Sequence, residues 1–543
     1  MSPFAYQTIT GRFSDQMNST PRQGLLARID SLFNETGSYD PAAASIDSKR
    51  SLHALTSVHS KSAKPLKLYG VTGDIAGLTL FSAKFSKILA GRDITDVSFY
   101  IQNLNKEDIT VISAARDISP YNANSKQRSL AGDFDRGNII VDESNETVLK
   151  NIDGTAQQSR ITAGDIQING QGYLEVLAGR NLDLGTGPNY KDGTGVGITS
   201  IGNYRNPFLP FEGASIIAMA GVQGSSGGAA LGLEGSNLDF EKISLEGTAG
   251  KTYATKELEK IASLSTFFKL LQQAGTESET TGSYETGFAA IESVFGKVTG
   301  TGEVFTRARN IRTSTGGEIT IAAPSGALTM ASDIYGNPST PPGIVTEYGG
   351  EVSIFTHGSV DIGKTRIFTL RGGDMTIWSS TGDIAAGTSP KTVVTAPPTR
   401  VVIDTTSADV ATDLGGLVTG GGIGVLASVK GIEPANVYLI APVGTVDAGD
   451  AGIQATGDIK IAAAAVLNAD NISAGGTKSG VPSAPVTAAP NVSGLTSGSS
   501  STAAASSAAD SVANQGAKQS QETVETPSII SVEVLGYGGG DEE

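Results

Sequence analysis

The most informative absence in this sequence is cysteine. Its 543 residues include no Cys, and they include only three His residues, at positions 53, 59 and 357. Without thiols the chain cannot form disulfides, use a thiolate nucleophile, or bind Fe–S clusters and zinc through Cys. Three scattered His residues are also a poor basis for a zinc site. We therefore expect no metal and no cofactor.

Charge and long apolar runs are also scarce. Charged residues make up 17% of the chain, and 39 Lys and Arg against 55 Asp and Glu give a net charge of −16. This balance disfavours a nucleic acid or an anionic lipid surface as a partner. No apolar run reaches the ~18 residues of a membrane-spanning helix, so membrane insertion is not expected. Residues 1–17 lack the basic, apolar and small-residue regions of a signal peptide, which indicates either that the chain is not exported or that it is part of a longer precursor.

Glycine, in contrast, is abundant, with 69 residues, and it marks a repeat. Four segments align without gaps, and each contains a turn, a polar–apolar alternation and a second turn, followed by another short alternation. Gly349 and Gly372 are 23 positions apart, which gives the period, and longer spacings reflect loop insertions. The segments are GGEITIAAPSG from Gly316, GGEVSIFTHGS from Gly349, GGDMTIWSSTG from Gly372 and PANVYLIAPVG from Pro434.

The repeat predicts an all-β fold, a right-handed parallel β-helix. Alternation with a period of two buries one face of each strand, and Gly turns the chain at each corner. A two-strand unit cannot bury its apolar side alone, but coils stacked ~4.8 Å apart can. A β-propeller, the alternative, would show a longer, four-stranded period. We place the coils at residues 67–222 and 309–473, after an N-terminal flanking segment, residues 1–66.

Between the two sets of coils, residues 223–308 form an insertion with helical periodicity. Apolar residues recur every three or four positions, and Gly296 matches a helix stop. The pattern predicts a helical hairpin growing out of one coil. Its two apolar stripes can pack against each other, against the side of the β-helix, or against a partner. The stripes are Leu258, Ile261, Leu264, Phe268 and Leu271, followed by Tyr284, Phe288, Ile291 and Phe295.

Three further segments interrupt or follow the coils. Residues 388–417 are rich in Pro and Thr and predict a long loop or an extra strand pair. Residues 474–527 consist largely of Ser, Ala, Gly, Thr and Pro, the composition of a flexible tether. Residues 528–543 regain strand alternation, and we expect this candidate docking strand either to add to an edge of its own β-helix or to be bound by another protein through strand addition. Its apolar positions are Ile530, Val532 and Val534.

Acidic residues recur at equivalent corner positions. Glu318, Glu351 and Asp374 occupy the same slot in their coils, so they are predicted to form an acidic ladder with a spacing of ~4.8 Å. Parallel β-helices also carry the carboxylates of polysaccharide lyases and glycosidases, and an acidic groove would serve such an enzyme. A solvent-facing ladder is the more common arrangement, so we assign no catalytic residues and expect no enzyme. A second pair of acids, Asp165 and Asp183, lies in successive turns.

The corner arginines and the tryptophan also allow a prediction. Arg92, Arg116 and Arg180 stand next to the corner acid in other coils, and we expect them to pair with those acids on the surface, which is worth little energy. Trp378 follows an apolar position of its coil. It is a candidate stacking platform for a sugar if it points outward, or it fills a shallow groove.

Four longer motifs are more specific than single coils. They are LKLYGVTGDI from Leu66, GQGYLEVLAGRNLDLGTG from Gly170, GVGITSIGN from Gly195 and the closing VEVLGYGGG from Val532. Together with the Gly-Gly-acid-apolar coils, they resemble the C-terminal part of filamentous-haemagglutinin-like exoproteins of Gram-negative bacteria. The resemblance covers roughly residues 50–472 and the tail.

The resemblance implies a large secreted β-helical protein that passes the outer membrane through a β-barrel transporter of the two-partner type. It also implies service as an adhesin or other surface factor. The signal peptide and the Asn-Pro-containing secretion domain of such exoproteins are not found in this sequence, nor is an Arg-Gly-Asp triplet. We therefore expect a non-enzymatic, extracellular or cell-surface rod associated with the outer membrane, if the chain is part of a longer exported precursor. Its ligand, on a host cell, a bacterium or a glycan, is not identified by the sequence.

Overall fold

A computed structural model of the chain describes most of the predicted coils and the helical insertion. All described residues belong to the first of two units, Met1–Ala484. They are residues 53–121, 164–185, 195–222, 251–296, 301–330, 341–388 and 418–482, apart from positions 205, 308 and 428–430, together with residue 50 and short strands between 140 and 161 and between 393 and 413.

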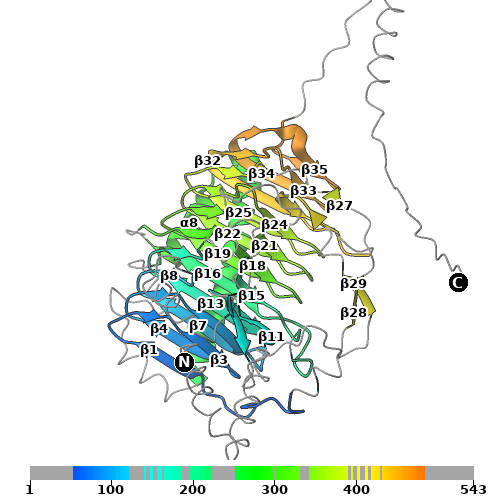
Figure 1. The fold of residues 1–543 in the computed structure, drawn as a ribbon. Coiled ribbons are helices and arrows are strands. Elements are labelled where there is room, and N and C mark those ends of the chain that lie inside the picture. The colour runs from blue at the N-terminus through cyan, green and yellow to red at the C-terminus, as the bar shows by residue number, and fades with distance from the viewer. Residues whose placement is uncertain are drawn as a thin grey trace, which may run out of the picture. The chain divides into compact units, whose positions relative to one another are not determined.

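The described chain forms a parallel β-helix with three faces (Figure 1), which confirms the predicted parallel β-helix. Each coil contributes one strand to each face, except the last described coil, which has a face A strand alone, and strands pair with those of neighbouring coils. Face A comprises β1 (Leu66–Gly70), β4 (Ser86–Ala90), β7 (Ile109–Ala114), β13 (Tyr173–Ala178), β16 (Ser215–Ala220), β19 (Ile319–Ala323), β22 (Val352–Thr356), β25 (Met375–Ser379), the first parts of β32 (Val437–Asp447) and β34 (Ile459–Leu467), and β36 (Lys478–Ser479).

The other two faces complete each coil. The short face B comprises β2 (Ile75–Ala76), β5 (Ile94–Thr95), β8 (Ile118–Ser119), β14 (Leu182–Asp183), β17 (Val304–Arg307), β20 (Leu328–Met330), β23 (Val360–Asp361), β26 (Ile384–Ala385) and the last parts of β32 and β34. The ten strands of face C are β3 (Thr79–Ser82), β6 (Ser98–Gln102), β12 (Ile166–Asn169), β15 (Gly195–Ser200), β18 (Arg309–Thr313), β21 (Gly343–Thr346), β24 (Arg366–Thr369), β31 (Gly422–Val425), β33 (Ile453–Ala455) and β35 (Ile472–Ala474). We number the coils by their face A strands, from coil 1 at β1 to coil 11 at β36.

The interior is filled by aliphatic side chains that stack in register. Alternate residues of each strand point inward, and the same slot of face A holds a small or branched aliphatic residue in one coil after another. Full burial of one such large aliphatic side chain contributes on the order of 1.5–3 kcal/mol. The stacked residues, all at most 2% exposed, are Ile88, Ile112, Val176, Ala218, Ile321, Ile354, Ile377, Leu439 and Ile461.

The repeated Gly pairs turn the chain from face C to face A. Gly317, Gly350 and Gly373 have φ angles of +88°, +95° and +89°. A Cβ atom at Gly350 would lie 2.2 Å from the carbonyl oxygen of Gly317, and one at Gly373 would lie 2.2 Å from that of Gly350. Larger residues are therefore excluded by backbone conformation and by the neighbouring coil. The carbonyl oxygens of these glycines accept hydrogen bonds of 3.0 Å from the hydroxyls of Thr313, Thr346 and Thr369.

The insertion between β16 and β17 contains two helices, α7 (Lys251–Thr281) and α8 (Glu285–Phe295), as the helical periodicity predicted. Gly296 follows α8 with a φ angle of +63° and donates its N–H to the carbonyl of Glu292 at 2.9 Å, which confirms the helix stop. Neither helix combines the length and the apolar character needed to cross a membrane, within the part of the chain that the structure describes.

Helix α7 runs along face A toward the later coils. Gln272 donates its side-chain amide to the Thr376 hydroxyl of β25 at 2.7 Å, and two turns later Glu279 accepts a bond of 2.6 Å from Ser479 of β36. The helix therefore bridges coils 8 to 11. Its apolar stripe and that of α8 pack both against each other and against the side of the β-helix. The outward face A residues in this cluster include Leu89, Val111, Leu177, Met219, Ala322, Phe355, Trp378, Ile440 and Ala462.

Two other excursions leave the coils as antiparallel strands. Between β26 and β31, β27 (Val393–Val394) pairs with β30 (Val418–Thr419), and β28 (Arg400–Ile403) pairs with β29 (Val410–Asp413), so the extra strand pair is confirmed. Between β8 and β12, the strands β9 (Ile140–Val141), β10 (Thr147–Lys150) and β11 (Ala156–Ile161) form a small antiparallel sheet. The sequence predicted coils throughout residues 67–222, so this excursion was not expected.

Candidate functional site

The predicted acidic ladder stands at the corner where face A begins. Glu318, Glu351 and Asp374 immediately precede β19, β22 and β25, whose first residues are register partners. The N–H of Ile319 donates to the Glu351 carbonyl at 2.9 Å, and the N–H of Val352 donates to the Asp374 carbonyl at 3.1 Å, so the three acids lie on consecutive coils. The structure thus brings together the residues that the sequence placed in one slot.

The carboxyl groups of this ladder repel one another and face a lysine of the hairpin. Partial burial raises the pKa of Glu351, and the neighbouring Glu318 and Asp374 raise it further, while Lys269 of α7 opposes the shift. Partial burial also raises the pKa of Glu318, again against Lys269. Raised carboxyl pKa values are a property of general acids, but they also follow from stacking like charges at one corner.

The same corner continues as a ladder of bonds from side chains to backbone. Asp374 accepts the N–H of Asn436 at 2.8 Å, the Asn436 side-chain oxygen accepts the N–H of Asp458 at 2.8 Å, and Asp458 accepts the N–H of Thr477 at 2.7 Å. At the earlier end, the Ser215 hydroxyl accepts the N–H of Glu318 at 3.1 Å. This continuation was not predicted from the sequence. Its signal is the polar residue that precedes the alternation in every one of these coils.

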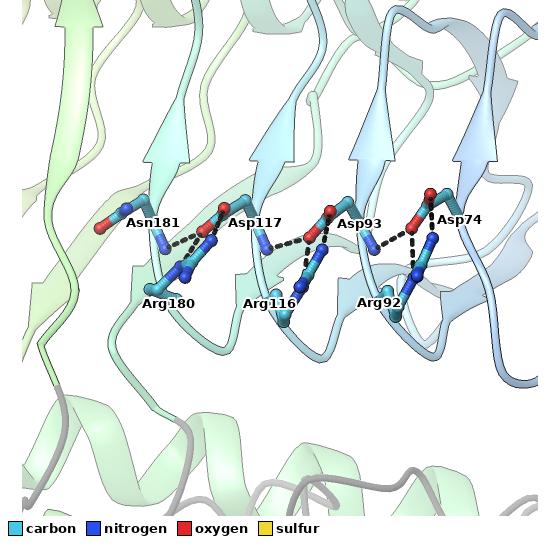
Figure 2. A network of polar contacts seen from close by, with 7 residues as sticks. All are labelled: Asp74, Arg92, Asp93, Arg116, Asp117, Arg180 and Asn181. Atoms are coloured by element: carbon cyan, nitrogen blue, oxygen red, sulfur yellow. Dashed lines mark hydrogen bonds and ion pairs between the residues drawn. The ribbon is translucent and has the colours of Figure 1, made fainter.

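A second ladder stands where face A turns into face B, and it pairs acids with arginines (Figure 2). Arg92 donates to Asp74 through Nε at 3.0 Å and Nη2 at 2.7 Å. Arg116 donates to Asp93 in the same two-pronged manner. The third pair is Arg180 with Asp117, joined through Nε at 2.8 Å and also through Nη2. The predicted pairing of the corner arginines with corner acids is confirmed.

Each acid of this ladder also binds the backbone of the following coil. Asp74 accepts the N–H of Asp93 at 3.2 Å, Asp93 that of Asp117 at 3.1 Å, and Asp117 that of Asn181 at 3.1 Å (Figure 2). The bond from the Arg92 side chain lowers the pKa of Asp74. Burial raises the pKa of Asp117, but the bonds from Arg180 and the Asn181 N–H outweigh it, so the net shift is downward. These contacts tie coils 1 to 4 together.

The other candidate acids are kept apart. Asp183 ends β14 of face B, where Arg307 donates to it through Nη2 at 2.8 Å and Nε at 3.1 Å, a pairing that the sequence analysis did not predict. Asp165 precedes β12 of face C, is 3% exposed, and accepts a bond of 3.4 Å from the Tyr100 hydroxyl. Because the two carboxyl groups belong to different faces and have different partners, they do not form a catalytic pair in this structure.

Trp378 points outward from face A but is covered by the hairpin. Its side chain is 0% exposed, its Nε1 donates to the Ser380 hydroxyl at 3.0 Å, and its ring meets those of Tyr284 and Phe288 edge to face. No face of the indole is open to a sugar, so the stacking hypothesis does not fit, and Trp378 packs the groove between the helices and the sheet. Gly287 makes room for it.

Two points remain, namely the candidate docking strand and the question of a metal site. Ile530, Val532 and Val534, the candidate docking strand, fall outside the described residues. Among the residues that the structure does describe, no three His, Asp or Glu side chains are grouped so as to hold a metal ion.

Comparison with known proteins finds a similarity to a protein family. Residues 372–483 match a family described as filamentous haemagglutinin family outer membrane protein. The matched stretch begins at coil 8 and extends to the end of the β-helix, and it confirms the resemblance that the sequence motifs indicated. No curated protein and no solved structure is significantly similar to the chain.

Proposed function

We propose that this chain, which is similar over residues 372–483 to a filamentous haemagglutinin family outer membrane protein, is a secreted or cell-surface exoprotein of the adhesin type. Its β-helix is a rigid support, and its insertions bind a ligand on another surface. The proposal includes a non-enzymatic role and export through an outer-membrane transporter of the two-partner type.

The position of the insertions carries this proposal. Coil 7 connects β23 to β24 with only four residues, 362–365, so a short connection suffices to pass from face B to face C. Four other coils carry much longer connections at this same corner. Loops that recur on one side of a regular scaffold are where solenoid proteins concentrate binding. These connections are residues 120–165, 184–194, 331–342 and 386–421.

The hydrogen bonds of the charged residues at the corners also support a binding role over a catalytic one. The arginines and most of the acids at the two face A corners bond to the neighbouring coil, either to a side chain or to a backbone N–H. Such groups hold coils in register and are not available to transfer a proton to a substrate.

Replacing residues 386–421 by the four-residue connection of coil 7 tests the proposal. We expect the shortened chain to keep the thermal midpoint of the parent within a few degrees, because coil 7 shows that the corner closes without an insertion. Binding of the fluorescently labelled chain to epithelial cells or to Gram-negative cells should fall about tenfold or more, the effect of removing a main contact region. Replacing the insertion at 331–342 in the same way is the matched comparison. Unchanged binding by both variants contradicts the proposal.

The alternative, a carbohydrate-active enzyme, has its best support in the raised pKa values of Glu318 and Glu351. It is tested by incubating the full chain and the Glu351→Gln variant with a panel of acidic and neutral polysaccharides. We expect no new reducing ends and no unsaturated product from either protein. Cleavage by the parent chain that is lost in Glu351→Gln would assign the acidic ladder to catalysis instead.

A further inference from the structure

A side-chain amide and a hydroxyl meet where the hairpin lies on the β-helix. Gln272 of α7 donates through Nε2 to Oγ1 of Thr376 in β25 at 2.7 Å. The two residues are 104 positions apart in the sequence and belong to separate elements. Thr376 is 1% exposed, and Gln272 is half-buried. A primary amide and an alcohol are therefore held together at a place that little water reaches.

The distance between these two groups suits a reaction as well as a hydrogen bond. Because Cδ of Gln272 is bonded to Nε2, a hydrogen bond of this length places Cδ about 3.5 Å from Oγ1 of Thr376. Reacting atoms that are well oriented for attack lie about 3–3.5 Å apart. The terminal torsion of a Gln side chain is broad, so its amide can turn the face of Cδ toward the hydroxyl. Thr376 is thus positioned as a nucleophile toward Gln272.

Rigid packing holds the two groups in place. Leu271, the neighbour of Gln272, and Trp378, two residues after Thr376, are both 0% exposed and belong to the same hydrophobic cluster. Ser353 of coil 7 and Tyr438 of coil 9 are the register partners of Thr376. Groups that are fixed in this way react with effective molarities far above any concentration in solution.

A carboxylate lies beside the threonine hydroxyl. Asp374 precedes Thr376 by two positions, so both side chains leave β25 on the same side, with Cα atoms about 6.6 Å apart. Oδ1 of Asp374 accepts the N–H of Asn436 at 2.8 Å, which orients the carboxylate, and Oδ2 has no hydrogen bond among the described residues. At this separation a carboxylate reaches the hydroxyl directly or through one water. An oriented base beside a hydroxyl is the arrangement that activates Ser and Thr nucleophiles.

We propose that Thr376 and Gln272 form an ester cross-link between the β-helix and the hairpin, with Asp374 as the proton acceptor. Asp374 takes the hydroxyl proton while Oγ1 of Thr376 attacks Cδ of Gln272, and the C–O bond forms. The C–N bond then breaks, and the proton passes from Asp374 to the nitrogen, which leaves as ammonia. An alcohol and a primary amide thus give an ester and ammonia, and no other reactant is consumed. The proposal is independent of any ligand that the insertions bind.

A second Gln–Thr pair in the chain provides a contrast. Gln167 of β12 donates through Nε2 to Oγ1 of Thr199 in β15 at 3.4 Å, and the two are register partners on face C. This longer bond places the amide carbon about 4 Å from the hydroxyl oxygen. The residue two positions before Thr199 is Gly197, which has no side chain to accept a proton. We therefore expect this pair to keep its amide and its hydroxyl.

Mass spectrometry of the full chain tests the cross-link. We expect the folded chain to have the mass of its sequence less one ammonia, and a digest to join the peptide with Gln272 to the peptide with Thr376. Hydroxylamine, which cleaves esters, should separate these peptides. Thr376→Val should have the full mass, whereas Thr376→Ser and the control Thr199→Val should keep the loss of ammonia.

Two outcomes overturn the cross-link. One is the full sequence mass of the parent after prolonged incubation of the folded chain at neutral pH. The other is a loss of ammonia that Thr376→Val retains, as cyclisation of an asparagine would give. Far-UV circular dichroism of Thr376→Val checks that the variant is folded.

The role of Asp374 is tested by the rate of the reaction. Asp374→Asn keeps an oxygen for the N–H of Asn436 but cannot take up the hydroxyl proton. We expect it to lower the rate of cross-linking by about a hundredfold or more, the usual contribution of a positioned base. Intact mass, followed from the time of synthesis in a cell-free reaction, measures the linked fraction. Glu351→Gln removes a neighbouring carboxylate and should react at the parent rate. Equal rates for the parent and Asp374→Asn overturn the assignment of Asp374.

Discussion

Gly287 of α8 lies against the indole ring of Trp378 so closely that a Cβ atom at position 287 would be 2.4 Å from Cη2. Gly275 of α7 has the same relation to Ile440, with 2.8 Å to Cγ1. At both places the backbone of a helix rests directly on a side chain of face A. The hairpin is therefore fitted to the solenoid at the level of main-chain atoms.

This fit predicts the effect of one added methyl group. Gly287→Ala should lower the free energy of unfolding by about 1–3 kcal/mol, because overpacking against a buried ring outweighs the gain in helix propensity. Ser293→Ala on the exposed side of α8 is the control and should be neutral or slightly stabilising. Urea denaturation followed by Trp378 fluorescence measures both. A rise in stability for Gly287→Ala would show that the interface has room.

The acid–arginine ladder predicts a pH-dependent loss. The pKa of Asp117 is lowered in the folded chain. Its contribution to the free energy of unfolding is therefore present above pH 3.8, the ordinary pKa of Asp, and is lost as the pH falls through the pKa of the folded chain. Asp117→Asn should cost about 0.5–1 kcal/mol near neutral pH, since the pair is partly exposed. The cost should vanish near pH 2. Urea midpoints of the two proteins across this range measure it, and Asp361→Asn, outside the ladder, is the control. A cost that persists at low pH contradicts the ion pair as its source.

The acidic ladder predicts the opposite dependence. The pKa of Glu351 is raised, so the folded chain holds that proton more tightly than the unfolded chain, and the stabilisation is present below the ordinary Glu value of 4.5 and lost as the pH rises. Glu351→Gln should therefore match the parent near pH 4 and exceed it slightly near pH 7. Glu107→Gln is the control. A variant that is less stable than the parent near neutral pH would mean that Lys269 more than compensates the repulsion.

The lysine in the last described coil predicts a change in association. Lys478 of the last coil takes the position that Ile459 holds in coil 10, and Lys478→Leu replaces this exposed charge by an apolar side chain. We expect the variant to form oligomers in sedimentation experiments at concentrations where the parent sediments as a smaller species, because exposed apolar edges pair. Lys460→Leu, on the outward side of β34, is the comparison. Equal sedimentation of parent and Lys478→Leu contradicts a capping role.

The β-helix was predictable because its requirements are local. The Gly pairs at 316–317, 349–350 and 372–373 are needed wherever a corner has positive φ and a neighbouring coil ~4.8 Å away. Alternation then identifies the strands, and the corner acids and arginines follow by their repeated position. Residues at the same position of the repeat stack on one another in the structure, so the pairs at Arg92 and Arg116 follow from spacing alone.

The features that escaped prediction depend on contacts distant in sequence. The apolar stripes of α7 and α8 were compatible with three packing surfaces, and the choice of face A depends on the outward residues Phe355, Trp378 and Ile440, which single coils do not distinguish from core residues. The same ambiguity made Trp378 a candidate for sugar stacking. The antiparallel strands between 140 and 161 lack the Gly-acid-apolar pattern of the coils, but they are too short to show a pattern of their own.

A solenoid whose coils touch only their neighbours unfolds in sections, since a break at one place leaves the rest intact. Helix α7 changes this behaviour, because a single rigid element is bonded to Thr376 in coil 8 and to Ser479 in coil 11 and is packed on the coils before them. The last coils cannot separate without breaking contacts of a helix whose Phe267 also packs on Phe355 of coil 7. The last coils are thus mechanically coupled to coil 7, and a pulling force applied after coil 11 is shared among coils that would otherwise unfold one after another.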